Sequence, residues 1–329
     1  MDDLERMTAD TIPARIVLGG TSAARQPRAV VAFRMPNETA RPPLSWQVGD
    51  VRITRILEFQ VPVPWSPDRP YIDGASPEAL RGLAWLVPDH ATEQGDLWMA
   101  VHGLLIQAPE MSILVDTCVG NDKPRKMVFN RALHGPFLER LSNTGCPREA
   151  VDRVVCTHLH VDHVGWNTML DGEAWVPTFP NARYLIARAE YEAWDMAADP
   201  EYPAIMEDSI RPIFDAGLVD LVELDEAICP GVRLRPTTGH TRGHVSIESE
   251  SRGARALING DFIHHPCQIA EPTWATAFDD DRAAAHATRV QILEELAGTD
   301  TLLIGTHFAS PTAGYVQRQP QGLRLVSSD

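Results

Sequence analysis

The densest group of chemically active side chains lies in the segment 157–163. Within six residues stand four groups that bind metals: His158, His160, Asp162 and His163. Side chains two positions apart at the end of a strand point the same way, so the first two histidines can converge on one ion. Imidazole and carboxylate together suit zinc or a similar first-row metal. Four neighbouring ligands on one turn favour a pair of ions over a single one.

Three further candidate ligands follow later in the chain, each directly after a short predicted strand. They are His240, Asp261 and His307. Acids and imidazoles at strand ends are where loops build sites on a rigid sheet. Each signal is weak alone, because a strand-end aspartate more often serves in a turn. Their order after the first motif gives them weight.

In this order the motifs resemble those of the metallo-β-lactamase superfamily, whose signature runs H-x-H-x-D-H, Gly-His, Gly-Asp and a final His. The resemblance covers roughly residues 45–315. Within the superfamily the chain looks most like the branch that holds methyl parathion hydrolase and the quorum-quenching lactonases. The run 114–123 and the spacing of the last three motifs favour the former.

The resemblance implies an αββα sandwich, in which two mixed β-sheets are flanked by helices and the metals lie at one edge. It assigns the first metal to His158, His160 and His240. The second metal falls to Asp162, His163 and His307, with Asp261 bridging both. A hydroxide between the two ions would be the nucleophile, since paired cations lower the pKa of bound water and polarise a substrate oxygen.

Two divalent ions are therefore expected as cofactors. Zinc is the first choice, and Mn²⁺, Co²⁺ and Fe²⁺ are the alternatives because His/Asp sites discriminate weakly between metals.

The predicted catalytic set is Asp162, Asp261 and His264. Lactonases of this kind often carry a tyrosine three residues after the bridging aspartate, and here that position is His264. An imidazole there can hydrogen-bond a substrate carbonyl oxygen or donate a proton.

Aromatic residues beside the ligand motifs are the candidates for substrate binding. They are Trp166, Trp274 and Phe308. Two further polar residues are expected to support the ligands without binding metal: His244 by orienting a ligand and Asp116 by holding a loop.

The elements that must position these residues alternate between short strands and helices. Strands are expected at 51–57, 104–107, 112–116, 153–157, 183–186, 232–236, 245–250, 256–259 and 301–305. Helices are expected at 137–143, 187–196 and 281–296. The last has Asp281 as N-cap and apolar positions at Ala287, Val290, Leu293 and Leu296. The stretch 62–95 predicts a long loop, and the whole pattern indicates a mixed α/β fold.

Composition predicts a globular chain with an N-terminal arm over residues 1–44 and a catalytic domain over residues 45–329. The net charge of −16 disfavours nucleic acid as a partner. No apolar run reaches the length of a membrane span, and the acidic start lacks a secretory signal. Five scattered cysteines indicate reduced thiols. The expectation is a cytoplasmic protein that acts on a small molecule, with a homodimer allowed by the resemblance.

The leading functional hypothesis is a di-zinc hydrolase of small esters, lactones or organophosphotriesters. One alternative is a thioesterase resembling glyoxalase II, although Arg318 and Arg324 near the C-terminus do not make the basic cluster expected there. The other is a non-catalytic binding protein stapled by metal. Structural zinc sites tend to be closed and often use thiolates, so seven His/Asp ligands favour the hydrolase.

Overall fold

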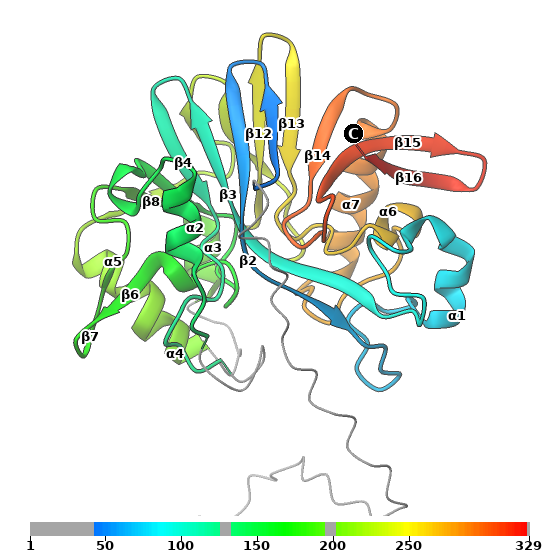
Figure 1. Ribbon diagram of the computed structural model, residues 1–329, viewed down its shortest axis with the longest axis horizontal. Coiled ribbons are helices and arrows are strands. Elements are labelled where there is room, and N and C mark those ends of the chain that lie inside the picture. The colour runs from blue at the N-terminus through cyan, green and yellow to red at the C-terminus, as the bar shows by residue number, and fades with distance from the viewer. Residues whose placement is uncertain (1–42, 126–132, 195–201, 328–329) are drawn as a thin grey trace, which may run out of the picture. The chain divides into compact units, whose positions relative to one another are not determined.

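The computed structural model describes residues 43–125, 133–194 and 202–327. Most of the predicted N-terminal arm, residues 1–42, lies outside this part of the chain. The described residues contain two seven-stranded sheets and one separate hairpin, β6 (Thr168–Asp171) with β7 (Ala174–Pro177). Figure 1 shows the two large sheets standing face to face.

The first sheet joins its strands in the order β1-β2-β3-β4-β5-β8-β9. Their bounds are β1 (Ser45–Val48), β2 (Val51–Val63), β3 (Leu97–Ala108), β4 (Met111–Val115), β5 (Arg153–Cys156), β8 (Arg183–Ala187) and β9 (Val219–Val222). Strands β3 and β4 form an antiparallel hairpin and contain the predicted strands 104–107 and 112–116. From β4 onward the strands run parallel, so their carboxyl ends reach one common edge.

The second sheet runs from β10 to β16 in sequence order. Its strands are β10 (Ala227–Cys229), β11 (Val232–Pro236), β12 (Val245–Ser251), β13 (Ala254–Ile258), β14 (Thr301–Ile304), β15 (Ala313–Gln319) and β16 (Gly322–Ser327). Among the described residues of this sheet, β13 and β14 are the one parallel pair, and the other neighbouring strands are antiparallel. Asp261 and His307 follow these two strands, so both residues lie beyond the same sheet edge.

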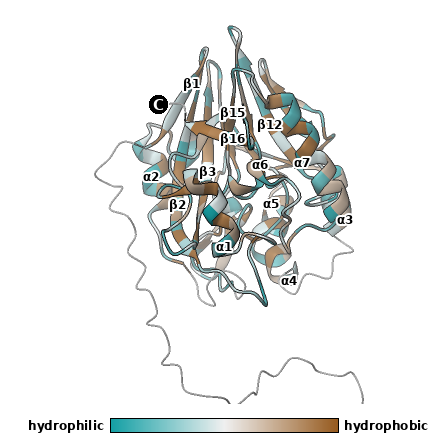
Figure 2. Ribbon diagram, turned by 90° about the vertical axis from the view of Figure 1, so that its right-hand side faces the viewer, coloured by the Kyte–Doolittle hydropathy of each residue, from teal (hydrophilic) through white to brown (hydrophobic). Residues whose placement is uncertain are grey.

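Seven helices within the described residues lie outside the two sheets. They are α1 (Pro77–Leu80), α2 (Phe137–Asn143), α3 (Arg188–Trp194), α4 (Tyr202–Ile205), α5 (Arg211–Asp215), α6 (Cys267–Ala270) and α7 (Arg282–Leu296). Figure 2 shows α6 and α7 beside the second sheet. None of the helices in the described ranges has the length and apolar content needed to cross a bilayer.

The core between the sheets explains why they pack. Ile106 and Val155 from the first sheet share one buried cluster with Ile247 and Ile304 from the second. Side chains alternate across a strand, so the opposite faces of the same sheets are left to pack against helices. One outer cluster contains Phe137 of α2. Another contains Ile292, Leu293 and Leu296 of α7. The αββα fold implied by the resemblance is confirmed.

Helix α7 corrects one detail of the prediction. Asp281 caps it as expected, since its Oδ1 accepts from the backbone N–H groups of Ala283 and Ala284. The predicted apolar position Val290, however, is 36% exposed. The buried face is instead rotated and contains Ala285, Arg289, Ile292, Leu293 and Leu296. Arg289 is held inside because its guanidinium finds buried carbonyl and carboxylate partners.

The stretch 62–95 is also not one long loop. Its first residues belong to β2, and α1 with a 3₁₀ turn at Arg81–Leu86 occupies its centre. Leu80 and Leu86 are buried in a small hydrophobic cluster. This burial stabilises the short helical turns where the sequence predicted a loop.

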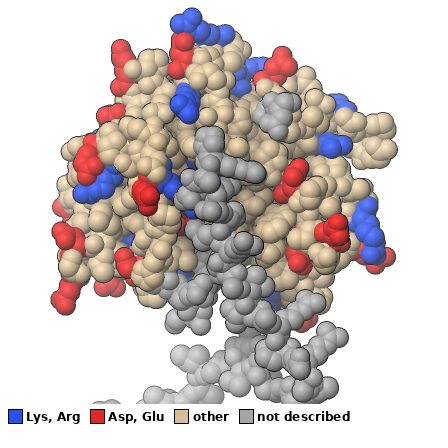
Figure 3. Space-filling model, in the orientation of Figure 1, with Lys and Arg blue, Asp and Glu red and all other residues tan. Residues whose placement is uncertain are grey.

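Acidic and basic side chains are interspersed over the face seen in Figure 3. No broad basic area is visible among the described residues on that face. This distribution agrees with the overall net charge of −16.

A buried lysine ties the β6–β7 hairpin to the body of the fold. The Nζ of Lys123 donates to the backbone oxygen and the hydroxyl of Thr168, each at 3.0 Å, and lies 3.9 Å from the centre of the Trp175 ring. Burial lowers the pKa of Lys123 to about 7. Between pH 7 and about 10.4, the Lys123 amine is therefore protonated in the unfolded chain and mostly deprotonated in the folded chain.

This lysine predicts a pH-dependent stability. Because the unfolded state binds more protons in that window, the contribution of Lys123 to folding improves as pH rises. Relative to Lys123→Met, the free energy of unfolding of the wild type is expected to increase by about 2 kcal/mol between pH 7 and pH 9. Urea unfolding of both proteins at the two pH values measures it. A difference that does not change with pH would contradict the prediction.

Candidate metal centre

Seven of the predicted site residues converge at the common edge of the two sheets. One group lies on the turn after β5: His158, His160, Asp162 and His163. His240 comes from the β11–β12 loop, Asp261 follows β13 and His307 follows β14. The arrangement needs both sheets, because each contributes ligands that the other lacks.

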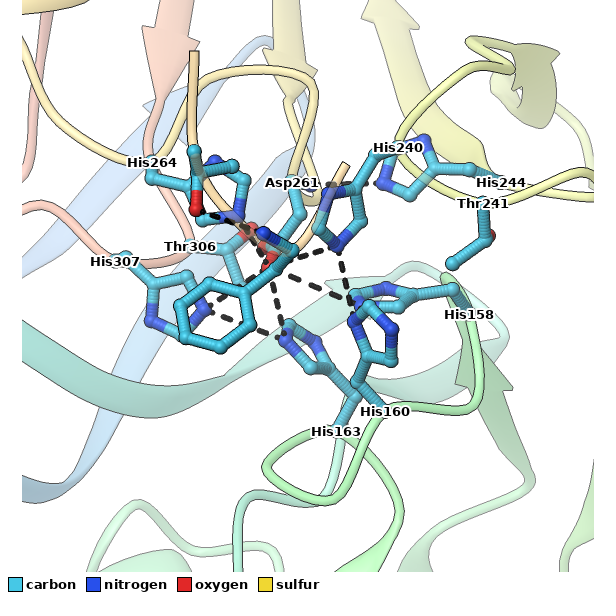
Figure 4. A network of polar contacts seen from close by, with 12 residues as sticks. His158, His160, His163, His240, Thr241, His244, Asp261, His264, Thr306 and His307 are labelled. Carbon is cyan, nitrogen blue, oxygen red and sulfur yellow. Dashed lines mark hydrogen bonds and ion pairs between the residues drawn. The ribbon is translucent and has the colours of Figure 1, made fainter. Parts of the chain in front are cut away.

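Asp261 lies at the centre of the group (Figure 4). Its Oδ2 is 3.3 Å from Nε2 of His163 and 3.2 Å from Nε2 of His307. The same oxygen is 3.6 Å from Nε2 of His240 and 3.8 Å from Nε2 of His158. One carboxylate oxygen therefore faces imidazoles of both predicted metal positions.

Hydrogen bonds on the outer side of three rings determine which nitrogen carries the proton. Nδ1 of His163 donates to Asp116 at 2.9 Å, and Nδ1 of His240 donates to Asp279 at 2.9 Å. Nδ1 of His307 donates to the backbone oxygen of Ala100 at 2.8 Å. A neutral imidazole has one N–H and one lone pair. With Nδ1 as donor, the lone pair of each Nε2 points to the centre.

His158 follows the same rule through a hydroxyl. Thr157 donates its single hydroxyl proton to Asp116 at 2.9 Å, so its oxygen accepts from Nδ1 of His158 at 3.0 Å. The Nε2 lone pair of His158 then also faces inward. It meets Nδ1 of His160 at 2.9 Å, and Nε2 of His240 lies 3.0 Å from the same atom.

These inward lone pairs fit divalent cations. Nε2 of His163 and Nε2 of His307 lie 3.3 Å apart, and in the neutral rings both atoms are acceptors, since each Nδ1 donates outward. Two buried acceptors in contact are unfavourable unless a cation lies between them. Oδ1 of Asp261 is likewise buried without a hydrogen-bond partner. The donor set of imidazoles and carboxylates suits zinc and related metals.

The electrostatics of the site agree. Burial, together with neighbouring imidazoles, holds the pKa values of His158 and His240 well below the usual range for histidine. Burial also lowers the pKa of His163, but the carboxylates of Asp261, Asp116 and Asp162 outweigh it and raise the pKa well above its usual value. The second position therefore attracts positive charge of any kind.

Two buried carboxylates that sequence reasoning missed hold the ligand loops together. Glu190 of α3 accepts from N–H of Leu159 at 3.1 Å and N–H of Gly243 at 2.9 Å. It thereby joins the H-x-H-x-D-H turn to the loop of His240. A β-carbon on Gly243 would lie 2.1 Å from the backbone nitrogen of Glu190, so only glycine fits there. Nothing in the local sequence marks Glu190 for this role.

Glu58 does the same on the other side of that turn. Its carboxylate accepts from N–H of Val119 at 2.9 Å, from N–H of Gly120 at 3.0 Å and from Nε1 of Trp166 at 2.9 Å. Burial raises the pKa of Glu58 to about 7. The glutamate fixes the segment that follows Asp116, which itself orients His163 as described above.

His244 supports Asp261, as the sequence suggested for an orienting residue. Its Nε2 accepts from the backbone N–H of Asp261 at 2.7 Å. Gly260 has a φ of +60°, and a β-carbon there would lie 2.5 Å from that nitrogen. The tight turn before Asp261 therefore depends on glycine.

The predicted substrate-binding aromatics pack in three different hydrophobic clusters. Trp166 is buried, stacks on Phe137 and bonds to Glu58. Phe308 is fully buried in the cluster under α7. Trp274 is half-buried and packs in a different cluster. For Trp166 and Phe308 this placement indicates packing, because neither ring leaves a face open to a ligand.

Other aromatic rings contact the ligands instead, and the sequence did not single them out. Tyr71 lies edge-on to His264, with ring centres 6.2 Å apart. Trp194 lies edge-on to His160 at 5.6 Å and stacks on Tyr202 at 5.5 Å. Tyr71 and Trp194 come from segments far from the ligand motifs, so their proximity is visible only in the fold.

The hydrogen bond from His240 to Asp279 predicts a measurable effect on metal binding. In Asp279→Asn the side-chain amide can donate to Nδ1, which would move the ring proton to Nε2 and block the inward lone pair. We expect metal binding about 10–100-fold weaker, measured by competition with a chromogenic chelator.

The exposed Asp215→Asn on α5 is the matched control and should bind metal like the wild type. Circular dichroism checks that both variants are folded. Equal metal affinity in Asp279→Asn and the wild type would show that this carboxylate does not set the tautomer.

Known proteins are similar to this chain in sequence and in fold. A family model described as the metallo-beta-lactamase superfamily matches residues 97–307. An N-acyl homoserine lactonase from a Bacillus species is 32% identical over 205 residues, which cover 57% of this chain and 73% of that protein. A probable metallo-hydrolase from Mycobacterium tuberculosis is 26% identical over 186 residues, covering 50% of this chain and 57% of that protein.

Solved structures agree on the fold. The dizinc quorum-quenching lactonase AidC, in complex with a homoserine product, superimposes with a TM-score of 0.71 at 20% identity and covers 87% of this chain and 97% of its own. The hydrolase AbOPH gives a TM-score of 0.70 at 24% identity and covers 88% and 98%.

The curated relatives are lactonases and metallo-hydrolases, so the alternative of a non-catalytic protein stapled by metal is set aside. With the fold, the ligand motifs and the family match in agreement, this chain is a hydrolase that belongs to the metallo-beta-lactamase superfamily.

Proposed function

We propose that this protein is a two-metal hydrolase that opens lactones, with N-acyl homoserine lactones as the first substrate class to test. The observation that carries the proposal is the set of inward-facing imidazole lone pairs around the buried Oδ2 of Asp261. The lactonase relatives support the choice of a lactone over other esters.

The proposed ligands are those expected from the sequence. His158, His160 and His240 would hold the first ion, and their ligand atoms lie within 4.8 Å of one another. Asp162, His163 and His307 form a second such group and would hold the second ion. Asp261 would contact both. Zinc is the proposed metal, since imidazole and carboxylate donors suit it.

Paired divalent cations supply a nucleophilic oxygen at neutral pH and polarise the bond under attack. The chain's own groups keep the site ready for that chemistry. Asp116, Asp279 and the Ala100 carbonyl hold the ring protons of His163, His240 and His307 on the outer side. These hydrogen bonds fix the orientation of the rings and leave each Nε2 facing the centre.

Asp162 is the carboxylate best placed to exchange a proton with substrate or water. Its side chain is 24% exposed, whereas that of Asp261 is 4% exposed. Its oxygens lie 3.6 Å from Nε2 of His163 and 3.6 Å from Nε2 of His307. The Asp162 carboxylate therefore contacts both the buried imidazoles and solvent. The role of His264 toward a substrate carbonyl, expected from the sequence, stays a prediction.

Tyr71 is the aromatic ring proposed to face the substrate. It is half-buried beside His264, whereas Trp194 beside His160 is 5% exposed and packed in the same core cluster as Trp166. A tyrosine ring offers apolar surface to an acyl chain and a polar edge to an amide. Trp274, also expected from the sequence, remains a candidate, whereas the burial of Trp166 and Phe308 speaks against them.

The homodimer and the cytoplasmic location expected from the sequence stay predictions. The organophosphotriester and thioester substrates do too, and no contact within the described residues favours either over a lactone.

A paired rate assay on zinc-loaded protein tests the proposal. An N-acyl homoserine lactone and a p-nitrophenyl phosphotriester are compared by kcat/KM. We expect the lactone to be turned over faster. Asp261→Asn should lower kcat/KM by roughly 100-fold or more, because it weakens the contact shared by both ions.

Asp215→Asn serves again as the folded control. Faster turnover of the phosphotriester would move the protein to the organophosphate hydrolases. If neither substrate is turned over although two metals are bound, thioesters become the next substrate class to test. Unchanged turnover and metal content in Asp261→Asn would overturn the metal-hydrolase proposal itself.

A further inference from the structure

His264 lies inside the metal centre, where the resemblance places no ligand. The residue is 3% exposed, and its Nε2 is 3.2 Å from Oδ2 of Asp261. Its ring centre is 4.7 Å from that of His240 and 5.9 Å from that of His307, onto which it stacks. Figure 4 shows the ring beside Asp261 among the other histidines.

Both ring nitrogens of His264 are buried without a hydrogen-bond partner. By contrast, the rings of His163, His240 and His307 each donate a hydrogen bond from Nδ1 to an outer acceptor and direct Nε2 inward. Leaving a buried polar group without a hydrogen bond costs about 1–3 kcal/mol. Nε2 has only the ion-pair contact with Asp261 given above, and a cation held by Nε2 and that carboxylate oxygen would satisfy both atoms.

The backbone around His264 is fixed, which keeps its ring in place. Oε1 of Gln268 accepts from N–H of His264 at 2.7 Å and from N–H of His265 at 3.2 Å. Nε2 of His265 donates to the backbone oxygen of His90 at 2.7 Å. Tyr71 packs against the edge of the His264 ring. The ring is therefore held by its loop and neighbours beside the carboxylate.

The ligand atoms of His264, His240 and Asp261 form a further group within 4.8 Å of one another. It shares His240 with the first predicted position and Asp261 with both positions. We propose that His264 is a direct metal ligand on the His240 side of the centre, an eighth protein donor beside the seven expected from the sequence. The inference rests on the two-metal site proposed above.

An added imidazole would have a chemical consequence. A nitrogen donor on the His240 side fills a coordination place that a catalytic site otherwise leaves to water or substrate. The more open side of the centre would then be that of Asp162, whose carboxylate is partly exposed.

Metal binding of His264 variants tests the proposal. Wild type, His264→Ala and His264→Gln are stripped and titrated with Zn²⁺ against a chromogenic chelator, and Co²⁺-loaded samples are compared by visible absorption. Gln keeps a hydrogen-bond donor and much of the volume but is a poor ligand. His286→Ala, which removes a half-buried imidazole on α7, is the matched control.

We expect two metal equivalents in the wild type and the control. In both His264 variants one of the two ions should bind about 10-fold more weakly or worse, since even residues that only orient a ligand have effects of about 10–100-fold. The Co²⁺ spectrum should change as one nitrogen donor is lost. Circular dichroism establishes that the variants are folded, and His264→Gln decides the question if the alanine variant is not.

Wild-type affinity and an unchanged Co²⁺ spectrum in His264→Gln would overturn the ligand role, whatever the loss of activity. That result would return His264 to the substrate-facing role expected from the sequence. If the wild type itself bound no more than one ion, the two-metal proposal would fail first, so the two failures are distinct.

Discussion

Acceptor atoms brought together in a buried space are the constraint on which the rest of this structure depends. Nε2 atoms of four histidines lie 3.2 to 3.8 Å from Oδ2 of Asp261, and two of these nitrogens are 3.3 Å from each other. Without cations this arrangement is unfavourable. It persists in the fold because every ring is fixed from behind by a carbonyl, a hydroxyl or a carboxylate.

The anchors of these rings come from many parts of the chain. Asp116 follows β4, Asp279 precedes α7 and Ala100 belongs to β3. Glu190 and Glu58 then join the ligand turns to one another through backbone N–H groups. The geometry of this site therefore depends on the packing of both sheets, since a shift of either sheet would separate the expected ligands from their hydrogen-bond partners. The supporting residues are as necessary to the chemistry as the ligands.

Three side chains border the histidines of the centre in addition to the seven expected ligands: Tyr71, Trp194 and His264. The two aromatic rings give these surroundings an apolar character. The imidazole changes the centre itself if it binds metal, because it takes up a place that another hydrolase leaves open.

The sequence alone determined the fold class, and it predicted seven ligands, which stand in short motifs after strands and which the fold brings together. These signals are local: an H-x-H-x-D-H turn or a Gly-Asp after an apolar run is readable without knowing what lies beside it. The N-cap Asp281 and the two strands of the β3–β4 hairpin were predicted for the same reason. The apolar face of α7 was not, because Arg289 is buried by partners outside the helix.

Only the tertiary structure decided which side chains surround these ligands. Glu190, Glu58, Asp279 and Tyr71 carry no local mark, since their role comes from loops that meet across two sheets. Trp166 and Phe308 stand next to ligand motifs in the sequence, yet their rings turn into the hydrophobic core. Proximity along the chain does not set the direction of a side chain. The packing of both sheets does, because burying apolar rings and pairing buried polar groups are satisfied together only in the folded molecule.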